Sequence, residues 1–162
     1  MEHYTYLEVP KVRRSEAFSG TAVVAVSAAV NAAHTAAHAG QHLMVLPAWQ
    51  FTYIAVVIYA APVVAAILLW TRLRRLGAWL LVASMAGSLV FGLLYHFLVP
   101  GWDNVFTQPP GPWRAVFVVT AVLLALLQAA GVLVGLRVAR EARRATRKFA
   151  DRRATGGFSD AR

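Results

Sequence analysis

Four long apolar stretches, separated by short polar or basic segments, dominate the pattern of this 162-residue chain. A helix needs about 20 mainly apolar residues to cross the hydrocarbon core of a bilayer. The pattern therefore predicts four spans, at about residues 18–46, 48–70, 78–98 and 115–136. Short connections favour neighbours that run up and down. The expected fold is all-α, an integral membrane four-helix antiparallel bundle.

Charged residues gather at the two ends of the chain and in one internal cluster. The sequence predicts an N-terminal segment at 1–17, a transmembrane domain at 18–138 and a basic tail at 139–162. Three of the 16 Lys and Arg residues precede the first span, three lie between the second and third, and nine follow the fourth. Because such residues collect on the cytoplasmic side, both termini are expected to be cytoplasmic in a multi-pass protein of the cell membrane.

The net charge of +9 follows from this topology and needs no nucleic-acid partner. The partners expected are the bilayer itself and anionic lipid headgroups, which a basic tail beside a membrane attracts. Gly131 and Gly135 have the small-xxx-small spacing that lets helices approach closely. This spacing indicates packing within the chain, and a homo-oligomer or a larger membrane complex is the alternative.

A cleaved signal peptide is a second interpretation of the first apolar stretch. A basic cluster precedes a modest apolar run, and small residues lie near Ala29 and Ala33. The apolar segment continues as plausible helix past both positions. A membrane span is therefore the preferred interpretation.

Histidines mark the candidate site. Three of the five histidines stand four residues apart, at His34, His38 and His42. This spacing puts them on one helix face. Under the predicted topology they approach the outer face, at a level similar to that of His96 at the end of the third span. Asp103 is the one acidic residue in the segment that follows. Ionisable residues at membrane depth suggest a functional site.

Neutral imidazole is a common ligand of metal ions, and two histidines at i and i+4 can chelate one ion. The candidate metal ligands are His34, His38, His42, His96 and Asp103. His38 and His96 are also candidate axial ligands of a b-type haem. Histidine with Met44 would favour copper, and histidine with Asp103 would suit zinc. The alternative is a set of interfacial histidines that bind backbone, lipid or neighbouring amides and no cofactor.

The first function hypothesis is a small multi-pass membrane protein whose histidine cluster binds a transition metal or haem for electron transfer or metal handling. A second hypothesis is a non-catalytic accessory or assembly protein without a cofactor. A third is a small oligomeric transporter, against which the lack of charged residues in mid-span argues. The chain contains no H-E-x-x-H, G-x-S-x-G or Walker A motif and no cysteine, so no catalytic residue is assigned.

Overall fold

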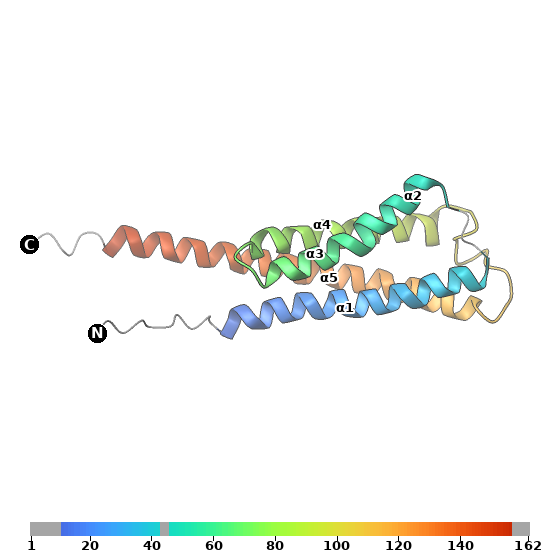
Figure 1. Cartoon of the computed structure of the whole chain (residues 1–162), viewed down its shortest axis with the longest axis horizontal. Coiled ribbons are helices and arrows are strands. Elements are labelled where there is room, and N and C mark those ends of the chain that lie inside the picture. The colour runs from blue at the N-terminus through green and yellow to red at the C-terminus, as the bar shows by residue number, and fades with distance from the viewer. Residues whose placement is uncertain (1–10, 43–45, 157–162) are drawn as a thin grey trace, which may run out of the picture.

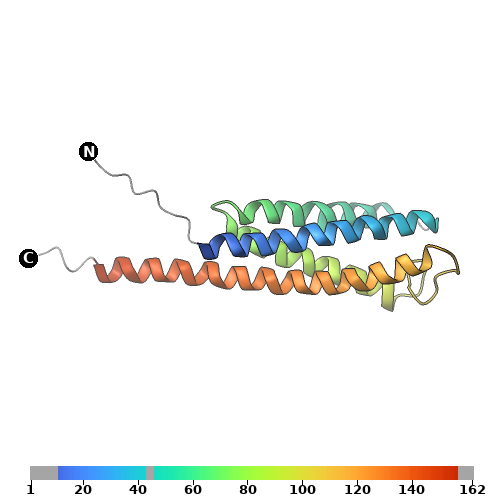
Figure 2. The ribbon, with the colours of Figure 1, turned by 90° about the horizontal axis from the view of Figure 1, so that it is seen from below.

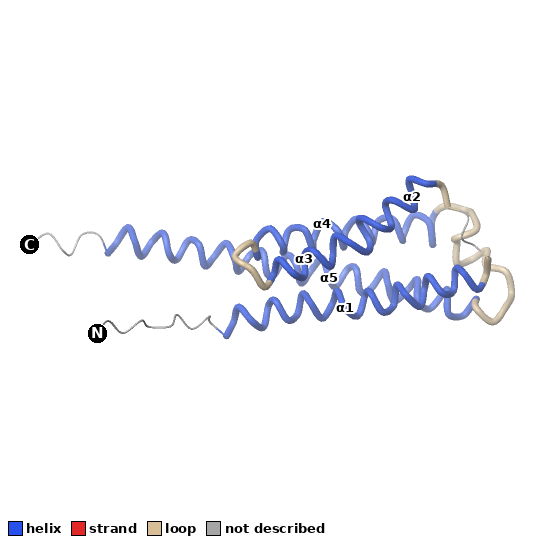
Figure 3. Tube along the Cα trace, viewed as in Figure 1, coloured by secondary structure: helices blue, strands red, loops and turns tan. Residues whose placement is uncertain are grey.

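The computed structural model describes residues 11–42 and 46–156, and it describes side chains within 14–42 and 46–144. Within these ranges every regular element is a helix and no strand is present (Figure 3). The first ten residues of the predicted N-terminal segment, and Met44, lie outside the described residues. The all-helical prediction is confirmed for the part of the chain that is described.

The helices form four long rods that lie side by side, and successive rods run in opposite directions (Figures 1 and 2). The rods are α1 (Lys11–Gly40); α2 (Ala48–Tyr53), η1 (Ile54–Ala60) and α3 (Ala61–Leu69) in sequence; α4 (Arg74–Leu93) with η2 (Leu94–Leu98); and α5 (Arg114–Gly156). Helix α5 packs against α1 and α4, and α3 packs against α4. The two described chain ends therefore lie at the same end of the molecule, opposite the long loop before α5 (Figure 1).

Each rod contains a segment that is long and apolar enough to cross a membrane. These segments are Arg14–Gly40, Ala48–Leu69, Arg74–Leu98 and Arg114–Arg144, with mean hydropathies of 1.3, 2.3, 1.9 and 2.5. The first has the lowest value because it is rich in alanine and carries the histidines. The four predicted spans are thus confirmed as helices of sufficient length and composition.

The first helix differs from its predicted bounds at both ends. It begins at Lys11, so that it includes the basic cluster, and it ends at Gly40 rather than near residue 46. The chain leaves the helix through His42, whose φ of 57° is left-handed. Gly40 is also required by packing, because a Cβ there would overlap the indole of Trp113 at the start of α5. The end of α1 is therefore fixed against the end of the long loop that precedes α5.

Pro62 lies within the second rod, in α3. The described backbone accommodates it with a π-helical segment, η1, which ends two residues earlier at Ala60. In this segment the backbone N–H of Ala61 bonds to the carbonyl of Val56, five residues earlier. A proline lacks an N–H and crowds the preceding turn, so a helix that contains one needs a local change of hydrogen bonding.

Small and polar side chains make up much of the interior, together with a few large apolar ones such as Phe117, Leu81 and Met85, whereas many large apolar side chains face outward. The buried polar residues of the described segments are Ser27, His34, Gln50, Ser84, Ser88, His96, Asn104, Gln108, Thr120 and Gln128. Ile67, Leu126 and Leu133 are each at least 60% exposed. Water disfavours such an outer surface, whereas lipid chains accept it. This distribution supports the membrane assignment independently of hydropathy.

Helices α4 and α5 approach each other closely where α5 carries two glycines. A Cβ at Gly131 would lie 2.8 Å from Met85 Cγ, and one at Gly135 would lie 2.7 Å from Val82 Cγ2 and 3.2 Å from the Ala78 carbonyl oxygen. Both glycines therefore face α4 of the same chain. The small-residue spacing serves packing within the chain, as the sequence predicted.

We expect Gly135→Ala to destabilise the folded protein. The added methyl group would press on Val82 and on the α4 backbone, which cannot move as freely as a side-chain end. Overpacking of this kind costs roughly 1–3 kcal/mol. Thermal unfolding in detergent measures the change. Gly111→Ala is the matched control, since a Cβ at Gly111 would meet nothing within 4 Å. Equal stability of the two variants would contradict the close packing.

Candidate metal centre

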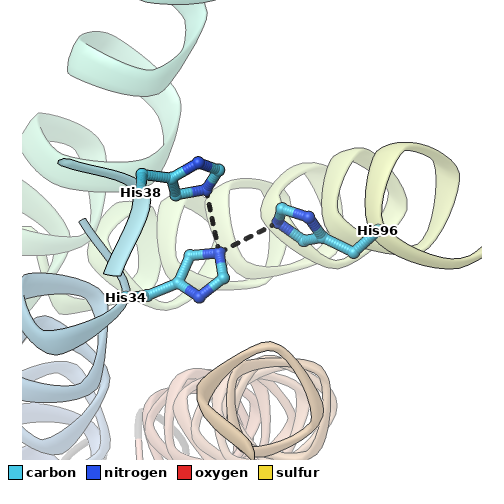
Figure 4. Close-up of side chains that lie close together, drawn as sticks. All are labelled: His34, His38 and His96. Carbon is cyan, nitrogen blue, oxygen red and sulfur yellow. Dashed lines mark hydrogen bonds between the residues drawn. The ribbon is translucent and has the colours of Figure 1, made fainter. Parts of the chain in front are cut away.

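Three imidazole rings from two rods point toward one another (Figure 4). His34 and His38 project from successive turns of α1, and His96 comes from η2 at the end of the third rod. The Nε2 atom of His34 lies 3.2 Å from Nε2 of His38 and 3.2 Å from Nε2 of His96. One nitrogen from each ring lies within 4.8 Å of the others. The arrangement brings together histidines that are 62 residues apart in the chain.

A π-helical turn positions His96. In η2 the backbone N–H of Val99 bonds to the carbonyl of Leu94 at 2.7 Å, a five-residue separation that closes the helix. The loop then turns back, and the N–H of Val105 donates to the carbonyl of His96 at 2.9 Å. The Asn104 amide donates to the Val99 carbonyl at 3.1 Å and stabilises this turn. Single π-helical turns occur often at functional sites, where they redirect a side chain.

Each ring has an acceptor at its other nitrogen. The backbone carbonyl of Asp103 accepts from Nδ1 of His96 at 2.9 Å. The Asp103 carboxylate lies 3.5 Å from Nδ1 of His38. Thr120 Oγ1 lies 2.8 Å from Nδ1 of His34 and donates its own proton to the carbonyl of Val116 at 2.6 Å. The hydroxyl therefore presents a lone pair to His34.

These partners favour the tautomer with the proton on Nδ1 in each ring. A neutral imidazole carries one N–H, and the nitrogen that faces an acceptor holds it. With Nδ1 of His34, His38 and His96 protonated toward these partners, each Nε2 would carry a lone pair that faces the other rings. Three lone pairs that face one another repel unless a positive charge lies between them. Ligating histidines show the same pattern, with the second ring nitrogen donating to a carbonyl or carboxylate.

The distances between nitrogens suit a tetrahedral ion. Zn–N bonds of about 2.0–2.1 Å at tetrahedral angles separate two ligand nitrogens by about 3.3 Å. The two contacts made by Nε2 of His34 are 3.2 Å each. His38 and His96 flank His34, with ring centroids 5.9 Å apart. The three ligand nitrogens lie within 4.8 Å of one another, so His38 and His96 would have to approach each other before all three could bind one tetrahedral ion.

Phe117 of helix α5 covers part of the cluster, and the most exposed of the three histidines is His38. Phe117 is fully buried, and its ring centroid lies 4.8 Å from that of His34 and 4.9 Å from that of His38. His34 and His96 are 6% and 9% exposed. The side chains of His38 and Asp103 retain 13% and 18% exposure. Access to the cluster is therefore on the side of His38 and Asp103.

Two cavities lie near the cluster. A cavity of about 670 Å³ at the loop end of the rods includes Asp103, Gln41, Gln50, Tyr95 and Trp102 in its described lining, but none of the three cluster histidines. An inner cavity of about 70 Å³ lies deeper along the rods and is lined in part by His34 and His96. The cluster therefore directly borders the inner cavity, and Asp103 borders the larger one.

The structure unites three of the five residues that the sequence suggested as metal ligands. His42 is exposed beyond the end of α1 and is not in the cluster. Asp103 lies behind the rings of His38 and His96, as an acceptor for both Nδ1 atoms. Sequence reasoning missed Thr120 and Phe117, because a threonine and a phenylalanine inside an apolar span carry no distinctive signal.

We expect Thr120→Val to release the tautomer of His34. The substitution removes the acceptor at Nδ1 and keeps the shape of the side chain, so the proton can move to Nε2. The ¹⁵N chemical shifts of the imidazole in detergent-solubilised protein distinguish the two tautomers. Thr52→Val is the matched control, since Thr52 bonds to the backbone of Ala48. An unchanged His34 tautomer in Thr120→Val would contradict the assignment.

No family model, curated protein or solved structure matches this sequence. Its chemistry is therefore inferred from the molecule itself. The features that bear on it are three convergent imidazole nitrogens, their acceptors, and four helices of membrane-spanning length.

Proposed function

We propose that this chain is a multi-pass membrane metalloprotein that binds one transition-metal ion through Nε2 of His34, His38 and His96. One observation carries the proposal. All three Nε2 atoms converge, while the Nδ1 atom of each ring faces an acceptor. A metal ion is a positive charge that can satisfy three lone pairs at once, and the acceptors behind the rings orient them as ligands.

Zinc is the ion that this donor set fits best. The ligands are three neutral nitrogens, the chain has no cysteine thiolate, and the spacing agrees with Zn–N bonds. Imidazole also suits copper, iron and nickel. Copper would bring electron transfer, whereas zinc would bring Lewis-acid chemistry or metal handling. The Asp103 carboxylate supplies a nearby negative charge for either divalent ion.

The packing favours a bare ion over haem. A haem with His38 and His96 as axial ligands needs a porphyrin between the two rings. The His34 ring already lies between them, with centroid distances of 4.7 Å and 4.8 Å to its neighbours. Phe117 packs against all three rings. A macrocycle would have to displace both His34 and Phe117.

The distribution of Lys and Arg supports an antiparallel bundle in the cell membrane with both termini in the cytoplasm. The histidine cluster is then near the outer face, and ions reach it from outside past Asp103. Metal handling at the outer face is the role that this orientation favours. The basic tail is suited to contact anionic lipid headgroups of the inner leaflet.

We expect chelator-treated wild-type protein in detergent to bind about one Zn²⁺ per chain. His34→Ala removes the central ligand and should weaken binding by more than the roughly 10–100-fold that loss of an outer-shell partner costs. Isothermal titration calorimetry gives the affinity, and elemental analysis gives the stoichiometry. His42→Ala is the control and should bind as the wild type does, because His42 is exposed outside the cluster.

Three outcomes of that experiment oppose the proposal in different ways. Protein that binds no metal would favour an accessory or assembly role without a cofactor, with a shared proton between the rings. A Soret band in the purified protein would support haem. Equal loss of binding in His34→Ala and His42→Ala would point to non-specific effects.

The proposed orientation predicts which loops face outward. Because the chain has no cysteine, labelling of a single introduced thiol shows on which side of the membrane that residue lies. Phe106 is 75% exposed in the loop before α5, and Arg72 is exposed between α3 and α4. In intact cells a membrane-impermeant maleimide should label Phe106→Cys and should label Arg72→Cys only after lysis. The reverse pattern would invert the topology.

A further inference from the structure

The inner cavity of about 70 Å³ lies within the membrane-spanning part of the rods, and its mainly apolar wall includes several polar groups. Hydrogen-bonding groups from all four rods border it: Asn31 and Thr35 from the first, Tyr59 from the second, Ser88 from the third and Gln128 from the fourth. Burying polar groups away from water is costly unless they find partners. In a membrane such groups are retained mainly where they serve a function.

A second cavity of about 40 Å³ continues deeper from the first. The two share Asn31, Tyr59, Ser88 and Gln128 in their linings. Ser27 lines the deeper cavity, is 4% exposed, and its hydroxyl has no hydrogen-bond partner among the described residues. A buried hydroxyl without a protein partner indicates water. At about 30 Å³ per water molecule, the first cavity has room for about two.

The inner cavity borders the proposed metal ion on the side away from Asp103. The rings of His34 and His96 form part of its wall. Three protein ligands leave a fourth position of a tetrahedral ion open, which is the arrangement of catalytic rather than structural zinc sites. Two of the three proposed ligands, His34 and His96, form part of the cavity wall, so we place the open position of the ion toward this space, which is large enough for a small molecule.

We propose that the inner cavity is the binding site for an exogenous ligand of the metal ion. This inference rests on the proposed function. The ligand is water at rest, and the cavity admits molecules of up to about three non-hydrogen atoms in its place, a limit set by a volume of roughly two water molecules. The centre thereby takes small exogenous ligands or substrates and is not a closed structural site.

Two features set the size and polarity of what enters. Gly92 forms part of the wall between the metal ligands and the polar end, because a Cβ there would lie 3.8 Å from both His96 Cδ2 and Gln128 Oε1. The Gln128 amide offers a donor and an acceptor to a molecule inside. A hydrogen bond of 2.8 Å between the Thr35 and Tyr59 hydroxyls joins the first and second rods beside the cavity.

The test uses Co²⁺ as a coloured replacement for zinc and azide, a linear three-atom anion, as the ligand. Azide should change the visible bands of the wild-type Co²⁺ protein in a saturable way. Gly92→Ala adds a methyl group to the cavity at ordinary contact distances and should weaken azide binding at least tenfold with Co²⁺ uptake unchanged. Gly111→Ala, the same change in open space, should bind azide as the wild type does.

A second variant separates volume from polarity. Gln128→Leu keeps a side chain of similar size and removes the amide, so it should also weaken azide binding while Co²⁺ uptake is unchanged. The inference is overturned if Co²⁺ binds and azide leaves the bands unchanged, or if azide binds equally to wild type, Gly92→Ala and Gln128→Leu. Failure of wild-type protein to take up Co²⁺ or Zn²⁺ would instead overturn the proposed function, and the inference with it.

Discussion

The contact among three imidazole nitrogens constrains the structure around it. Two Nε2–Nε2 contacts of 3.2 Å, each a hydrogen bond when one of the two rings carries the proton, join the three histidines inside the molecule. These contacts hold only while the rings do not rotate away from one another. Thr120 and the two acceptors of Asp103 prevent that rotation from opposite sides. The geometry of the cluster thus depends on groups that do not themselves face its centre.

The acceptors in turn depend on the packing of the rods. Thr120 reaches His34 because α5 lies against α1, and α5 also packs closely on α4 through two glycines. Asp103 reaches both of its histidines because the outer loop turns back on η2 through Val105 and Asn104. Many large apolar residues face outward, and the interior retains small residues that allow these close approaches. The packing of the rods therefore also determines the geometry of the site.

Much of this architecture could be predicted from the sequence, for physical reasons that apply to particular residues. Long uncharged runs predict spanning helices, and i, i+4 spacing predicts that His34 and His38 share a face. The sequence also predicted that His96 lies at the same level as these histidines, because successive spans of similar length run in opposite directions. The sequence grouped His42 with His34 and His38, but His42 does not join their cluster. Helical spacing alone does not reveal that α1 ends at Gly40, where the contact with Trp113 requires a glycine. The roles of Thr120 and Asp103 depend on rotations about helix axes and on loop geometry, which periodicity does not specify.

The π-helical turn that carries His96 has an evolutionary consequence. Such a turn contains one residue more than the α-helical turn it replaces. Removing that residue would restore a regular helix and rotate the residues beyond it by about 100°, since an α-helix has 3.6 residues per turn. His96 would then point away from His34 and His38, while the helix would keep its length and hydrophobicity. A centre built on this turn can be gained or lost through insertion or deletion of a single codon, and two chains with nearly the same sequence can differ in whether they have one.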